Sequence, residues 1–188
     1  MTRPPRGPRR LSSFWRDRRG VSAVEFAFIA PVLIVMYCGL AELTQAMMAQ
    51  RRLSNIASAI GDLVAQSTQT GPLKMADIFS MGSIIMAPFP TTDLKMCVYS
   101  VTSDSAGKNT VAWAQPSTTG MANCPKQGDK PTDIAPGVLP ASQSVIIAKA
   151  SYAYTSTIKL VMPKTMTFNR TYYLRPRKSD TVLWSAAS

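Results

Sequence analysis

The stretch that decides the fold is residues 20–43, which read GVSAVEFAFIAPVLIVMYCGLAEL. Its central part, residues 26–41, carries no charged side chain. With its flanks from Val21 to Leu43, it predicts a helix about 34 Å long, enough to cross a hydrocarbon core of about 30 Å. The chain is therefore predicted to cross a membrane once, with residues 21–48 as the transmembrane helix.

The arginines before this stretch predict its orientation. Seven of the 21 basic residues fall in the first twenty positions, where the only acid is Asp17. Because cytoplasmic flanks of membrane helices are rich in Lys and Arg, residues 1–20 are predicted to be a cytoplasmic leader and the rest to lie outside, in the periplasm. The other basic residues are scattered singly, so the net charge of +11 does not indicate a nucleic-acid partner.

The helical pattern continues beyond the predicted membrane crossing. Apolar residues recur at helical spacing to about Gln66, and Gly71-Pro72 supplies a stop, so residues 49–70 are predicted to continue the helix in the periplasm. A second, shorter amphipathic helix is predicted over residues 74–87, ending before Pro88.

From there the apolar period changes from that of a helix to that of a strand. Segments rich in Val, Ile, Thr and Tyr predict four strands. They are Leu94 to Thr102, Thr110 to Ala114, Ser144 to Thr155 and Thr165 to Leu174. Residues 115–143 are rich in Pro and Gly and predict a long irregular loop. We therefore expect an α+β fold, in which residues 72–188 form a periplasmic domain with a four-stranded antiparallel sheet on the long helix.

The three cysteines indicate which cellular compartment the polar part of the chain occupies. Cys38 falls in the apolar stretch, whereas Cys97 and Cys124 lie in the polar part of the chain. A bridge between these two would contribute about 3.6 kcal/mol in the chain-entropy model, which would suit a small domain in an oxidising compartment. Two unpaired thiols remain the alternative, because spacing alone does not establish connectivity.

Glu25 is the residue that fits its surroundings least. A carboxylate carried into hydrocarbon costs about 2.5–3.5 kcal/mol even on lenient scales, so one kept there points to function and needs a partner. A peptidase at the cytoplasmic membrane face could cut after Gly20, which has no side chain and readily adopts an extended backbone. The cut would remove the leader and create an amine on Val21 that Glu25, in the same or an adjacent subunit, could pair with.

The block from Arg18 to Ala27, followed by Ala30-Pro31 and Glu42-Leu43, resembles the TadE-like pseudopilins of the tight-adherence (Flp, type IVc) pilus assembly system. Two C-terminal segments, residues 152–155 and 170–177, are similar to the closing strands of that family. Larger TadG-like relatives add a von Willebrand type A module, for which this chain has neither room nor an Asp-x-Ser-x-Ser motif.

The resemblance implies a minor pilin-like protein of the bacterial inner membrane, processed by a prepilin peptidase between Gly20 and Val21. The resemblance also implies that Glu25 is the acid used in processing or assembly. Phe26, next to it, occupies a position that is often aromatic in the family. The implied partners are the inner membrane, the prepilin peptidase, other pilin-like subunits and the pilus assembly platform. Whether the product enters the filament, caps its tip or stays in the membrane is left open.

Two other interpretations of the N-terminal stretch stay open. It could be an uncleaved signal anchor, or a signal peptide cut near Thr44-Gln45-Ala46, although the helical stripe runs through that point. An anchored periplasmic domain could also act as a binding module that recognises an envelope glycan or peptide through the loop at residues 115–143.

Catalysis is not expected from this chain. It contains no histidine, and its two cysteines outside the apolar stretch lack Cys-x-x-Cys spacing, so neither a metal site nor a cofactor is predicted. The carboxylates are isolated, and no Gly-rich phosphate loop or Gly-x-Ser-x-Gly elbow occurs.

Overall fold

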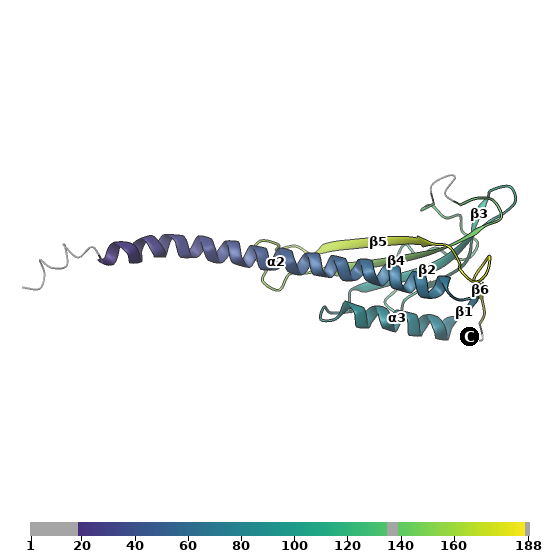
Figure 1. Cartoon of the computed structure of the whole chain (residues 1–188), viewed down its shortest axis with the longest axis horizontal. Helices are drawn as coiled ribbons and strands as arrows, with labels where there is room; N and C mark the ends of the chain where they lie inside the picture. Colours follow the sequence, from purple (N-terminus) through teal and green to yellow (C-terminus); the bar gives the residue numbers. More distant parts are fainter. Residues whose placement is uncertain (1–18, 135–138, 187–188) are drawn as a thin grey trace, which may run out of the picture.

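A computed structural model describes residues 19–134 and 139–186, so the predicted leader lies outside the described residues except for its last two positions. The elements follow in the order α2 (Arg19–Ala65), β1 (Gln69–Thr70), α3 (Pro72–Met86), β2 (Leu94–Ser103), β3 (Asn109–Pro116), β4 (Ser144–Tyr154), β5 (Met166–Leu174) and β6 (Leu183–Trp184). Figure 1 shows α2 as one long rod whose second half lies along the sheet and whose first half projects away from it. The α+β class and the second helix are as predicted.

The long helix α2 has two halves with different surroundings. From Gly20 onward its first buried side chain is Glu42, and from there buried residues recur at steps of three and four. This stripe faces the sheet, and we call its half of α2, together with all later elements, the sheet domain. The helix comes very close to the sheet at Gly61, where an added Cβ would lie 2.5 Å from Cδ1 of Leu174 and 2.9 Å from Cβ of Ala148. Glycine is therefore required for the helix to approach the sheet this closely.

The shorter helix α3 packs beside α2 on the same face of the sheet. It begins at Pro72 immediately after Gly71, with the proline in the first turn, where a missing N–H is harmless. Its buried residues include Met75 and Ile78, which join the α2 stripe in one core. Nη1 of Arg52 on α2 also donates to the carbonyl of Ile85 at 2.8 Å, tying the two helices together.

The main sheet has four antiparallel strands, as predicted, and the structure shows their order to be β3-β2-β4-β5. Alternate residues of β2 and β4 point to opposite faces, and both faces are covered. On the helix face, Val98 and Ala148 belong to the core shared with α2 and α3. On the other face, Tyr99 and Ile147 belong to a second cluster that the long β3–β4 connection covers. The sheet is thus the middle layer between the helices and that connection.

The long helix was predicted to continue through residue 70, but α2 ends at Ala65 and residues 69–70 form a strand. The two-stranded sheet to which this strand belongs was not predicted. Strands β1 and β6 pair in parallel, with Gln69 opposite Leu183 and Thr70 opposite Trp184. This pairing brings the C-terminal segment back beside the end of α2 (Figure 1). The indole N–H of Trp113 adds a hydrogen bond of 2.8 Å to the carbonyl of Val182. Two-residue strands carry too little periodicity for the sequence to predict them.

Candidate functional site: the membrane half of the long helix and the residues that border it

The predicted processing site lies at the start of α2. Gly20 and Val21 are in its first turn, and both are exposed. A Cβ added to Gly20 would meet nothing within 4 Å. Both residues of the predicted junction therefore lie on the surface of the described chain.

Glu25 lies one turn further along the same helix. Among residues 19–134 and 139–186 its carboxylate has no hydrogen-bond or ion-pair partner, and it is exposed in the single chain. Side chains of a helix tilt toward its N-terminus, and residues four apart stand roughly 5–6 Å apart at Cβ, so Glu25 leans toward Val21. The neighbouring Phe26 is 67% exposed. Any partner of Glu25 must therefore come from the chain terminus or from another molecule.

Apolar side chains surround the first half of α2 on every side. The large exposed ones are Val21, Val24, Phe26, Phe28, Ile29, Val32, Leu33, Ile34, Val35, Met36, Tyr37 and Leu40. Twelve such residues in twenty positions form no stripe, which is the pattern of a helix in lipid rather than at a protein surface. Among the described residues this is the one helix long and apolar enough to cross a membrane, which supports single-pass anchoring of the chain.

Glu42 marks the boundary between the two halves, and the sequence did not predict its role. Its side chain is 1% exposed. Its carboxylate oxygens accept hydrogen bonds from three successive backbone N–H groups of the β4–β5 loop: Leu160 at 2.7 Å, Val161 at 3.0 Å and Met162 at 2.7 Å. Consecutive N–H groups aimed at one anion form a strong, charge-assisted cradle. Glu42 is thus a structural clamp between the helix and the β4–β5 loop.

One signal in the sequence bears on Glu42, although it does not identify the partner. Glu42 stands four residues before Ala46, which is followed by Ala49 and Leu53, so it continues the buried stripe of the sheet domain by one more step. A carboxylate on a buried stripe must be paired or hydrogen-bonded. Its donors, however, lie 118 to 120 residues away in the chain, a separation that no local pattern spans.

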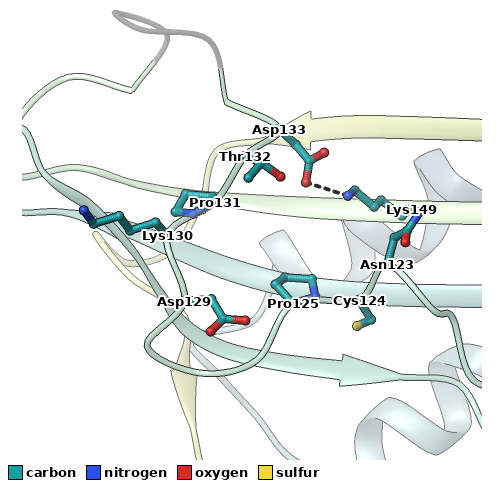
Figure 2. Close-up of a pocket in the computed structure, with 9 residues that line it drawn as sticks. All are labelled: Asn123, Cys124, Pro125, Asp129, Lys130, Pro131, Thr132, Asp133 and Lys149. Atoms are coloured by element: carbon teal, nitrogen blue, oxygen red, sulfur yellow. Dashed lines mark hydrogen bonds and ion pairs between the residues drawn. The ribbon is translucent and has the colours of Figure 1, made fainter.

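The disulfide between Cys97 and Cys124 is formed, and Cys38 is free. The bridge joins β2 to the β3–β4 connection on the face of the sheet opposite the helices. Beside it lies an open depression of about 540 Å³, shown in Figure 2. Its lining includes two carboxylates and two amines, those of Asp129, Asp133, Lys130 and Lys149.

Asp133 and Lys149 form the ion pair of this depression, with an Nζ to Oδ2 distance of 2.6 Å (Figure 2). The hydroxyl of Tyr99 donates to the same carboxylate oxygen at 3.0 Å. Partial burial favours a higher pKa for Asp133, but the hydrogen bonds from Lys149 and Tyr99 outweigh it and hold that pKa below its usual value. Burial and then the bond to Asp133 raise the pKa of Tyr99. The ion pair and the hydrogen bond from Tyr99 hold the connection on the sheet.

The predicted site residues fall into two separate groups. Gly20, Val21, Glu25 and Phe26 lie together in the first turns of α2, at its projecting end. The disulfide lies on the face of the sheet opposite the helices. Within the described part of the chain, no group of three or more His, Cys, Asp or Glu side chains is placed to hold a metal ion. The absence of a cofactor remains a prediction.

Most of the long helix α2 matches a known family model. The family model described as TadE-like protein matches residues 20–61, which include the Gly20–Phe26 block, the apolar half of α2 and Glu42. This confirms the resemblance of the N-terminal segment and supports a pilin-like protein associated with a tight-adherence pilus. The match does not reach residues 152–155 or 170–177, where the resemblance stays a prediction. No curated protein and no solved structure matches the chain.

Proposed function

From the TadE-like character of residues 20–61, we propose that this chain is a minor pilin-like subunit, stored in the bacterial inner membrane and cut by a prepilin peptidase after Gly20. The observation that carries the proposal is the uncovered apolar half of α2, with Glu25 near its exposed start. In the proposed assembly this half packs against the helices of other pilin-like subunits. The sheet domain then stands outside, at the base or on the surface of the filament.

The proposed orientation places the Arg-rich start in the cytoplasm and the sheet domain in the periplasm. The seven arginines before Val21 support the first half of this statement. The disulfide of the sheet domain supports the second half, because such bonds persist in oxidising compartments such as the periplasm.

Processing supplies the direct test of the proposal. In cells that carry the pilus system, we expect the mature protein to start at Val21, and we expect Gly20→Arg to leave a more slowly migrating precursor. An arginine side chain at this position would not fit a peptidase cleft that accepts glycine. N-terminal sequencing of the membrane-extracted protein distinguishes the two forms.

The matched control is Ser12→Arg, which adds the same charge to the leader without touching the junction. It should be processed like the wild type. Mature wild-type protein that retains residues 1–20 would contradict the proposal, and a new N-terminus near Gln45 would indicate a signal peptide instead.

A second candidate function, an anchored binding module, is favoured by the depression beside the disulfide. Its paired charges and openness suit a polar envelope ligand such as a glycan or a short peptide. The core shared with α2 means that residues 72–188 alone would lack half of their packing, so the test needs the full chain in lipid nanodiscs.

For this candidate we expect saturable binding of at least one member of a panel of cell-wall glycans and peptides. Lys149→Ala should weaken that binding at least tenfold, because it removes the amine that lines the depression, whereas the exposed Lys108 changed to alanine should leave it unaltered. Flat titrations across the panel would set the binding function aside.

A further inference from the structure

The loop at residues 155–165 leaves the sheet and crosses α2. It connects the end of β4 to the start of β5, and Figure 1 shows it passing across the rod where the sheet domain gives way to the projecting half. Its residues Leu160 to Met162 donate their backbone N–H groups to Glu42. We refer to this segment as the clamp loop.

The clamp loop is held in place on the helix by close contacts. Cγ2 of Val161 would lie only 3.1 Å from a Cβ built on Gly39, so the glycine lets the loop approach the helix. The hydroxyl of the buried Ser156 accepts from the N–H groups of Ile158 and Lys159, each at 3.3 Å. Lys159 has a φ of 57°, a left-handed conformation that reverses the chain at this point. These contacts give the loop a defined shape although it has no regular structure.

The outer surface of the clamp loop is apolar and basic. Ile158, Leu160 and Val161 are 43%, 51% and 54% exposed. The two lysines of the loop, Lys159 and Lys164, are exposed as well. A soluble loop of eleven residues would not normally direct three large aliphatic side chains outward. Aliphatic tips flanked by amines are typical of segments that lie at the boundary between lipid headgroups and acyl chains.

The position of the loop along α2 fits that boundary. From Gly20 to Gly39 a helix rises about 29 Å, close to the roughly 30 Å of a hydrocarbon core. No side chain of residues 20–41 is buried. The sheet domain begins to cover the helix at Glu42. When the apolar half spans the bilayer, the clamp loop therefore lies at the membrane surface on the side of the sheet domain.

We propose that the clamp loop is a membrane-docking element, which inserts Ile158, Leu160 and Val161 into the outer leaflet while Glu42 holds it against the helix. This rests on the single-pass anchoring included in the proposed function. The loop gives the domain a second attachment beside the helix, and so sets the height and tilt of the sheet domain over the bilayer. The phosphates of the lipid headgroups form ion pairs with the ammonium groups of the two lysines. An apolar contact with a second copy of the chain would leave these ammonium groups without a partner.

The proposal can be tested with nitroxide spin labels on the full chain in proteoliposomes. A single cysteine replaces Leu160 in a Cys38→Ser background, and collisions with oxygen, which partitions into lipid, are compared with collisions with a water-soluble nickel chelate. The reference position is Ser105, which is exposed at the end of the sheet opposite the clamp loop. We expect the oxygen-to-nickel ratio at position 160 to exceed that at position 105 severalfold.

Glu42→Gln should release the loop, because an amide accepts at only one of its two ends. The ratio at position 160 should then fall toward that at position 105, which should not change. Should Glu42→Gln fail to fold, the wild-type ratio at position 160 alone still decides the proposal.

Equal ratios at the two positions in the wild type would overturn it. Spin–spin broadening between labels at position 160 that persists when the protein is diluted in lipid would identify a second copy as the occupant, and would overturn it as well. A Gly20→Arg precursor should give the same depth, so failure of processing and failure of membrane docking are distinguishable.

Discussion

Replacing Glu25 with alanine is expected to abolish most pilus assembly while the chain still inserts and folds. Insertion should improve, because an ionised carboxylate in hydrocarbon costs about 2.5–3.5 kcal/mol and alanine removes that term. Folding should not change, since Glu25 is exposed in the described chain and lies in α2 well before Glu42, where the sheet domain begins. Assembly should fail because the charge that would pair with an amine of a neighbouring subunit is gone. Filament counts and co-purification of pilin-like partners measure the loss.

The control for Glu25→Ala is Val24→Ala, which shortens an equally exposed neighbour and should leave filament number near that of the wild type. A double variant tests the proposed partner. If the amine freed on Val21 is what Glu25 pairs with, then Glu25→Ala should add nothing to Gly20→Arg, since two groups that act together give non-additive losses. Normal filament number and normal partner recovery in Glu25→Ala would rule out the pairing.

The second large effect is expected from the disulfide. Changing Cys97 and Cys124 together to alanine should lower the free energy of unfolding of the sheet domain by about 2–5 kcal/mol, with about 3.6 kcal/mol from chain entropy for a sequence separation of 27. The stability is lost from the small core cluster on the face of the sheet opposite the helices, in which Cys97 is fully buried beside Tyr99 and Ile147. The bridge acts there together with the Asp133–Lys149 ion pair, which also holds the β3–β4 connection on the sheet.

Urea denaturation of the full chain in detergent, followed by tryptophan fluorescence, measures this difference. Cys38→Ala is the matched control. Because Cys38 forms no disulfide, this substitution should leave the midpoint of unfolding unchanged. Reductant should shift the midpoint of the wild type and of this control, but not that of the double variant. A wild-type midpoint that is the same with and without reductant would contradict the stabilising role.

Much of the architecture was predictable because helices and strands produce characteristic spacings of apolar residues along the sequence. The steps of three and four from Leu53 to Val64 predicted the second half of α2, which ends one residue before the expected Gln66. Alternation predicted all four strands of the main sheet to within two residues at each end. The block around Gly20 and Glu25 was identifiable because its chemistry depends on neighbours within one or two helical turns.

Other features depend on contacts between distant parts of the chain. The pairing of Cys97 with Cys124 stayed open until the strands and the loop were placed, because spacing alone permits two free thiols. The ion pair of Asp133 with Lys149 required the β3–β4 connection to fold back over the sheet. The same holds for the parallel pair of β1 and β6, whose strands are separated by more than a hundred residues.

The sequence by itself determined that this chain has one apolar helix long enough to cross a membrane, a charged residue near its start and a small α+β domain after it. These properties follow from composition and from periods of two and 3.6 residues, which need no knowledge of distant contacts. Only the tertiary structure decided that Glu42 is a clamp rather than a surface charge. A carboxylate takes its role from the donors around it, and the three N–H groups that hold Glu42 reach it only when the β4–β5 loop crosses the helix.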